Sequence, residues 1–276
     1  MRYRRSIATV ALATAMLMTI AAAQAFDETK YSDLKGQWDR AAGSGVWDTK
    51  TAPLTPEYRT ILEANVKDQR EGGQGGDPTY TCLAPGMPRV MNAYGPFEIV
   101  VTPNTTHVLM DHIYDSRRIF TDGRDWPKEI EPSFGGYSIG KWVDEDGGGR
   151  YDVLVVETRG LRGPRSYDGT GIPFHEDNKT VIKERIYLDK TDRNMLSDEI
   201  TVFDNALTQP WSVTKKYVRK TDKRPVWHEA VCAEGNAHLE IAGQNYFLSG
   251  DGRLMPARKD QPPPDLRYFK QTEKGR

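Results

Sequence analysis

Hydrophobic and polar positions follow two different patterns along the chain. Between residues 55 and 70 the apolar positions recur at helical spacing, and Thr55-Pro56 provides an N-cap and a first-turn proline, which predicts one helix. From residue 97 onward, short β-like runs are separated by turn residues, as is typical of strands. We expect strands near residues 97–102, 106–114, 117–121, 137–143, 151–158, 180–188, 195–203, 211–219, 226–232 and 245–249.

Closely spaced strands without helical pattern between them favour a sheet that closes on itself. We therefore expect a mainly β fold, an antiparallel β-barrel of the lipocalin or calycin kind, with an N-terminal helix and an irregular arm. The arm is residues 26–54, which hold tryptophans and glycines without any period. The predicted organisation is a signal peptide (1–25), the arm and helix (26–79) and a β-barrel domain (80–276).

The first 25 residues have the pattern of a secretory signal. Three arginines precede an uncharged apolar run from Ile7 to Ile20, and Ala23-Gln24-Ala25 has the small-x-small form of a cleavage site. We expect cleavage before Phe26 and a periplasmic or secreted protein with no membrane span afterwards. The alternative is an N-terminal anchor helix that is never cleaved.

Charge excludes one class of partner. The chain has 38 Lys and Arg residues against 39 Asp and Glu residues, a net charge of −1. Loss of residues 1–25 removes three arginines and no acid, which leaves 35 basic residues against 39 acidic ones. Nucleic-acid-binding proteins carry a basic surface, so we expect no nucleic-acid partner. The sequence does not indicate an oligomeric state.

Two cysteines, Cys82 and Cys232, are the whole thiol content of the chain. Export would place them where disulfides persist. A bridge would close a loop of about 150 residues and stabilise the fold by roughly 4–5 kcal/mol in the chain-entropy model. Free buried thiols are the alternative.

Alternation along the predicted strands places several acids on apolar faces. Glu184 alternates with isoleucines, Asp198 shares a face with Leu196 and Ile200, and a turn at 189–193 would bring the two acids together. Asp111 and Glu229 also fall on apolar faces. His112 would point the opposite way from Asp111 unless a bulge intervenes.

These inward acids have two explanations. Buried carboxylates need a metal, a cation or a shared proton, so Asp111, Glu184, Asp198 and Glu229 are candidate metal ligands. The structural alternative is that the acids pair with Lys215, Arg117 or Arg185 and hold the barrel together.

A polar loop over residues 163–178 is the second candidate site. Asp168, His175 and Asp177 are suitable metal ligands, and His175 oriented by Asp168 is alternatively a general base. We take His175, Asp168 and Glu184 as candidate catalytic residues. The alternative is a surface loop of Asx-turns.

Acids at alternate positions occur once more, at Asp144, Asp146 and Asp152. Their spacing resembles a calcium loop, but Gly148 occupies a position that usually carries an acid or amide. The alternative is a glycine-rich hairpin.

Several motifs resemble a large, mostly uncharacterised family of exported bacterial β-barrel proteins over roughly residues 80–240. They are 82–89 (CLAPGMPR), 117–124 (RRIFTDGR), 137–142 (YSIGKW), 171–175 (GIPFH), 184–185 (ER), 209–211 (QPW) and 231–234 (VCAE). That family is distantly similar to the nonheme diiron monooxygenase of platensimycin-type diterpenoid biosynthesis, which uses a twisted β-barrel. The resemblance implies one or two iron ions, with zinc or manganese as alternatives.

This chain departs from the family at two positions. Trp126 and Tyr137 stand where many members carry His. The ligands that the resemblance still implies are Asp111 or His112, His175, Glu184, and Glu229 with Glu234.

Three functions follow as hypotheses. The first is a metal-dependent enzyme, such as a nonheme iron monooxygenase acting on a small apolar molecule in the barrel lumen. The second is a non-catalytic, lipocalin-like periplasmic carrier of a hydrophobic ligand. The third is a metal-free isomerase or lyase with His175 and Asp168 as its acid–base pair.

Overall fold

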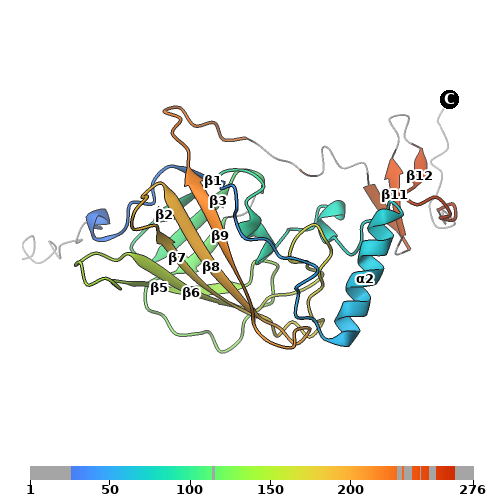
Figure 1. Ribbon diagram of the computed structural model, residues 1–276, viewed down its shortest axis with the longest axis horizontal. Coiled ribbons are helices and arrows are strands. Elements are labelled where there is room, and N and C mark those ends of the chain that lie inside the picture. The colour runs from blue at the N-terminus through green and yellow to red at the C-terminus, as the bar shows by residue number, and fades with distance from the viewer. Residues whose placement is uncertain are drawn as a thin grey trace, which may run out of the picture.

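The computed structural model describes residues 26–113, 116–228, 232, 238–242, 244–248 and 253–264. Within these residues nine strands form a closed barrel (Figure 1). In chain order they are β1 (Gln37–Arg40), β2 (Phe97–Val101), β3 (Thr105–Met110), β4 (Arg117–Phe120), β5 (Tyr137–Val143), β6 (Val153–Arg159), β7 (Val181–Leu188), β8 (Met195–Phe203) and β9 (Trp211–Arg219). A mainly β chain with a closed barrel is therefore confirmed.

The barrel is mixed, which corrects the expectation of a wholly antiparallel sheet. Strands β4 and β5 run parallel, with Ile119 opposite Ser138 and Phe120 opposite Ile139. All the other neighbouring pairs among the nine strands are antiparallel. Parallel strands need a long connection, and residues 121–136 supply it by returning the chain to the starting end of β4.

Strand β1 comes from the segment that was expected to be an irregular arm. It pairs antiparallel with β2 on one side and with β9 on the other, and so closes the barrel. Its Trp38 is fully buried and lies under the guanidinium of Arg219, 4.3 Å from the ring centre. Burial of one large aromatic side chain stabilises a four-residue strand that is too short to show a period.

Two expected strands end differently in the structure. The strand expected at 106–114 ends at Met110, so Asp111 and His112 lie in the turn after β3. Residues 226–228 of the strand expected at 226–232 are not in a strand, and residues 229–231 lie outside the described part of the chain. A separate sheet contains β10 (His238–Ile241), β11 (Gln244–Leu248) and β12 (Leu254–Pro256).

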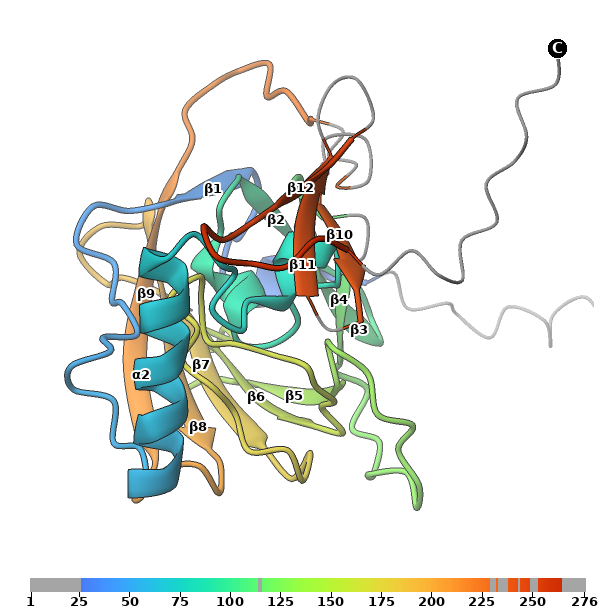
Figure 2. The same ribbon diagram turned by 90° about the vertical axis from the view of Figure 1, so that its right-hand side faces the viewer.

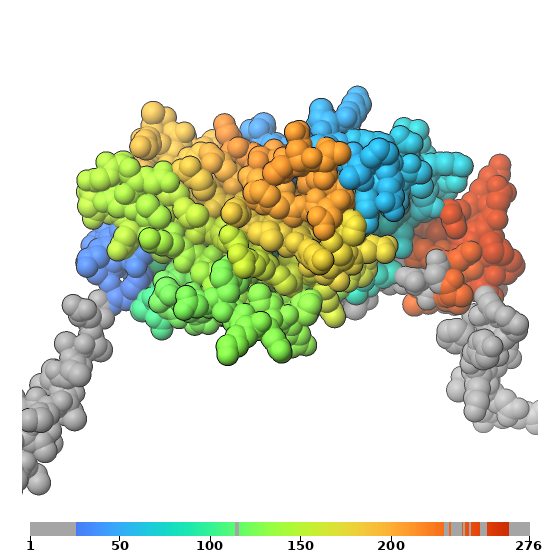
Figure 3. All heavy atoms as spheres, turned by 90° about the horizontal axis from the view of Figure 1, so that it is seen from below, coloured from blue at the N-terminus to red at the C-terminus, as the bar shows by residue number. Residues whose placement is uncertain are grey.

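Helix α2 (Pro56–Arg70) covers the residues with helical spacing. The Thr55 hydroxyl accepts the backbone N–H of Tyr58 at 3.4 Å, which caps the first turn. The sheet β10–β12 lies beside the later turns of α2 in both views (Figures 1 and 2), where Arg258 and Asp68 form an ion pair of 2.9 Å. Seen from below, this sheet forms one end of the molecule (Figure 3).

Short 3-10 helices complete the described elements, η1 (Glu28–Lys30), η2 (Pro78–Thr81) and η3 (Arg89–Asn92). No helix among the described residues is long and apolar enough to cross a membrane.

The core fills the barrel from inward-facing positions of the strands. On β7 the buried residues are Ile182, Glu184, Ile186 and Leu188, as the alternation predicts. Gly140 on β5 also faces inward, and a Cβ atom there would lie 2.6 Å from Ile119 Cγ2 on the parallel neighbour β4. Glycine at this position therefore lets β4 and β5 pack closely.

Candidate functional site

A buried ion pair joins two separate parts of the barrel wall. Glu184 on β7 and Arg117 on β4 expose 1% and 9% of their surface. Arg117 Nη1 donates to Glu184 Oε1 at 2.8 Å, and Nη2 donates to Oε2. Nη2 also lies 3.3 Å from Thr158 Oγ1, which hydrogen-bonds to Ser138 Oγ at 2.8 Å. Of the three basic partners considered for Glu184, the structure selects Arg117.

Asp198 on β8 lies beside this ion pair and is fully buried. The β7–β8 register sets Glu184 opposite Ile200 and Asp198 opposite Ile186, so the two acids are diagonal neighbours on one face. Neither oxygen of Asp198 meets a hydrogen-bond donor among the described residues. Burial and the charge of Glu184 raise the pKa of Asp198 well above its ordinary value. The protonated form is therefore favoured, and its O–H is able to donate to Glu184.

Lys215 on β9 is the cross-strand neighbour of Asp198 and is also buried. Its ammonium donates to the backbone carbonyl of Gly45 at 2.7 Å and lies 5.6 Å from the centre of the Trp47 ring. Burial lowers the pKa of Lys215 to about 8. We call the four buried side chains Arg117, Glu184, Asp198 and Lys215 the inner charge cluster. Its members come from β4, β7, β8 and β9, and Arg117 and Glu184 are the two that are joined to each other by hydrogen bonds.

The inner charge cluster does not offer the ligands that an iron ion needs. Both oxygens of Glu184 already accept hydrogen bonds from Arg117. The candidate ligands Asp111, His112, His175, Glu184 and Asp198 do not supply three ligand atoms at one point in the described chain. Glu229 and Glu234 lie outside the described residues. These five candidate ligands therefore do not form a shared iron, zinc or manganese site in the described part of the chain.

His175 and Asp168 each have their own local partners. His175 Nδ1 accepts the backbone N–H of Asp177 at 3.1 Å, and its ring packs on Tyr58 with centroids 5.2 Å apart. Asp168 Oδ1 accepts the backbone N–H of Thr170 at 2.8 Å, as in an Asx-turn. No hydrogen bond or ion pair joins the two side chains in the described structure. The Asx-turn agrees with the structural alternative for this loop, but Arg165, Ser166 and Tyr167 are buried, so the loop is not a surface loop throughout.

Asp111 and His112 lie close together because β3 has already ended. Asp111 exposes 6% of its surface, and its backbone N–H donates to the Pro96 carbonyl at 3.1 Å. Its carboxylate lies 3.8 Å from His112 Nδ1 and 3.3 Å from His228 Nδ1. Burial lowers the pKa of His112. The sequence argument required a β-bulge to bring Asp111 and His112 together, and in the structure the turn after β3 brings them together instead.

Asp144, Asp146 and Asp152 do approach one another. One oxygen from each lies within 4.8 Å of the others, in the only such group of three among the described residues. Each carboxylate also accepts a backbone N–H within the turn, from Gly149, Gly148 and Glu145 respectively. These bonds are those of a glycine-rich turn, but Asp144 Oδ1 is buried and has no hydrogen-bond partner among the described residues, so the calcium loop and the hairpin both stay predictions.

A cavity of about 790 Å³ opens at the end of the barrel where β4 and β5 begin. Most of its wall is apolar or aromatic, formed by Leu83, Ala84, Pro85, Met87, Val90, Tyr94, Ile113, Phe120, Phe134 and Tyr137. It reaches inward to Arg117 and Ser138, so it touches the inner charge cluster. One wall depends on Gly86, which has φ +63° and where a Cβ atom would lie 2.5 Å from the Phe134 carbonyl oxygen.

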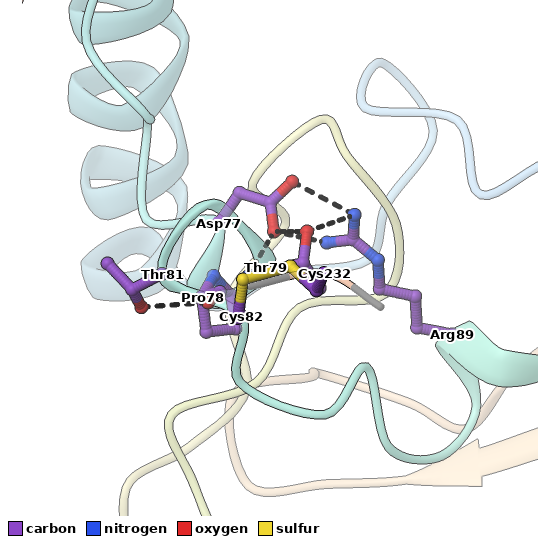
Figure 4. Close-up of a disulfide and its surroundings, with 7 residues drawn as sticks. All are labelled: Asp77, Pro78, Thr79, Thr81, Cys82, Arg89 and Cys232. Carbon is purple, nitrogen blue, oxygen red and sulfur yellow. Dashed lines mark hydrogen bonds and ion pairs between the residues drawn. A yellow bond between two sulfur atoms is a disulfide. The ribbon is translucent and has the colours of Figure 1, made fainter. Parts of the chain in front are cut away.

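The rim of the cavity is cross-linked in two ways (Figure 4). A disulfide joins Cys82 to Cys232, and both cysteines line the cavity. Behind it, buried Arg89 forms a bidentate pair with buried Asp77, with bonds of 2.5 and 2.9 Å. Arg89 also donates to Ser166 Oγ at 2.9 Å, which ties this rim to the loop before β7.

The sequence argument missed this cavity and the Asp77–Arg89 pair. Arg89 ends the first family-like motif, at 82–89, but no local pattern indicates a partner twelve residues earlier. The cavity wall comes from segments that are distant in sequence, so only the fold brings it together.

Trp126 and Tyr137, the two positions that depart from the family pattern, lie together with ring centroids 6.1 Å apart. Arg159 lies over Trp126 at 4.3 Å, and Arg124 Nη1 donates to the Tyr137 hydroxyl at 3.2 Å. Comparison with protein-family models and with curated proteins gives no match for the chain.

Proposed function

We propose that the protein binds a small, largely apolar molecule in the cavity at the end of the barrel, as a carrier. One observation carries the proposal, a cavity of about 790 Å³ with a mainly apolar and aromatic wall. Ligand sites in proteins are typically apolar clefts of roughly 300–1,000 Å³ with a few placed polar groups. The predicted export of the chain is consistent with transport of a poorly water-soluble compound.

The carrier is favoured over the metal-dependent oxygenase by the inner charge cluster. Arg117 neutralises Glu184, and Asp198 is favoured in its protonated form, so these acids need no metal ion. The acid–base enzyme has less support, because His175 and Asp168 contact different partners.

A titration with the neutral fluorescent probe 1-N-phenylnaphthylamine tests the proposal. The probe should bind the purified protein with an enhanced emission that saturates. Ala84→Trp places a large ring on the exposed part of the wall and should weaken binding by about tenfold, the equivalent of ~1.4 kcal/mol. Ala64→Trp, at an exposed position of α2 outside the cavity, is the matched control.

Two results would contradict the carrier. The first is equal probe binding by both tryptophan variants, which would place the probe elsewhere. The second is loss of binding when a chelator removes metal ions, because the proposed site uses none.

A further inference from the structure

The charged side chains that the described residues place on the cavity wall are all arginines. They are Arg89, Arg117 and Arg118, and no described aspartate or glutamate lines the cavity. The other titratable side chain of note is His112, whose pKa burial lowers, so the ring contributes little charge. An apolar cavity whose described wall carries cations and no anion favours a ligand of opposite charge.

Two of the three arginines are neutralised from behind the wall. Arg89 pairs with Asp77, and Arg117 pairs with Glu184, both through bidentate contacts between buried groups. The nearby carboxylate of Asp111 is also buried and faces His112 and His228. These acids are committed to their partners.

Arg118 is the exception. It is exposed on β4 and forms no ion pair with a described residue. Its cross-strand neighbour on β3 is His107. On the other side, the β4–β5 register sets the next residue, Ile119, opposite Ser138, so no acid from β5 faces Arg118 either. Among the three arginines of the described wall, Arg118 is therefore the one whose positive charge has no acidic partner.

We propose that the natural ligand is an amphiphile with a terminal carboxylate, whose apolar part fills the cavity and whose carboxylate pairs with Arg118 at the mouth. This inference rests on the proposed carrier function and adds the ligand class to it. A guanidinium suits a carboxylate because two parallel N–H groups match its two oxygens.

The experiment compares two probes with the same chain, decanoate and 1-decanol, as competitors of 1-N-phenylnaphthylamine at neutral pH. Exposed ion pairs are weak and are screened by salt. We therefore expect decanoate to displace the probe roughly threefold to fivefold more effectively than 1-decanol at low ionic strength. This preference should shrink on addition of salt.

Variants then assign the preference to one side chain. Arg118→Gln should abolish the preference for decanoate and leave the displacement by 1-decanol unchanged, whereas Arg118→Lys should retain most of it. Arg193→Gln is the matched control, because Arg193 is exposed in the turn between β7 and β8, away from the cavity.

The outcomes test the carboxylate inference and the carrier proposal separately. Equal displacement by the two probes in the wild type, or a preference unchanged in Arg118→Gln, overturns the carboxylate inference and leaves the carrier intact. Failure of both probes to displace, together with no saturable binding of the fluorescent probe, overturns the carrier itself.

Discussion

Asp198 and Glu184 occupy neighbouring inward positions on β7 and β8, and the two cations of the inner charge cluster lie beside them. Two carboxylates that share a buried face avoid ionising together, so one keeps a proton. Arg117 donates two hydrogen bonds to Glu184, and Asp198 is left without a donor among the described residues. The proton therefore belongs with Asp198.

This assignment predicts a pH dependence of stability. Since the pKa of Asp198 is raised in the folded state, the folded protein binds the proton more tightly than the unfolded chain. The stability that this group contributes is complete below the ordinary carboxyl pKa of about 3.9 and is lost as pH rises toward the folded value. Asp198→Asn removes the titration.

The free energy of unfolding in urea, measured for both proteins across this pH range, checks the prediction. The variant should gain stability relative to the wild type as pH rises, by at most about 1.4 kcal/mol per pH unit. Parallel pH profiles of the two proteins would show that Asp198 ionises as readily in the folded state as in the unfolded chain.

At the scale of elements, sequence alternation predicts the long strands and fails on the short ones. Strands β7 and β8 span eight and nine residues, and buried positions alternate along both except at buried Ser197. Their faces, their hairpin and the approach of Glu184 to Asp198 were therefore predictable. Strand β1 has four residues, and only its contacts with β2 and β9 define it. The parallel pairing of β4 with β5 depends on the path of residues 121–136, which alternation does not encode.

The site was less predictable than the strands. Alternation along the strand identified Glu184 as an inward-facing acid. It did not show whether the ion-pair partner of Glu184 is Arg117, Lys215 or Arg185, because the partner depends on which strands face one another across the barrel. The cavity wall was not predictable at all, since it combines the loop around Gly86, the start of β5 and the disulfide.

Packing between β4 and β5 gives a prediction at the same scale. Gly140→Ala places a methyl group 2.6 Å from Ile119 Cγ2 and 3.1 Å from Leu154 Cδ1. Overpacking of this kind costs about 1–3 kcal/mol, which urea unfolding would measure. Gly135→Ala is the control, because its Cβ would have no neighbour within 4 Å and no positive φ is required. Equal stability of the two variants would contradict the close packing of this pair of strands.

At the scale of the whole molecule, the disulfide connects the barrel to the chain that follows it. It joins residues separated by 150 positions. Cys82 follows η2 near the cavity, and Cys232 precedes the sheet β10–β12, which contacts α2 through Arg258. The last described part of the chain is therefore fixed to the first half at two places.

Loss of this link should destabilise the protein by about 2–5 kcal/mol, because the unfolded chain regains the freedom of a long loop. Urea unfolding with and without a reducing agent would measure the loss. The double variant Cys82→Ser/Cys232→Ser should unfold at the same urea concentration under both conditions. If the wild type is equally stable in reductant, the disulfide contributes nothing to the folded barrel.

The odd number of strands in the barrel explains why the barrel contains a parallel pair, β4 and β5. Neighbouring strands around a closed barrel alternate in direction throughout only if the number of strands is even. A barrel of nine strands therefore contains at least one pair of parallel neighbours. Here that pair is β4–β5, joined by only two register positions, and the cavity opens beside it. The odd number of strands requires one parallel pair, and in this barrel that pair lies beside the cavity where the ligand is proposed to enter.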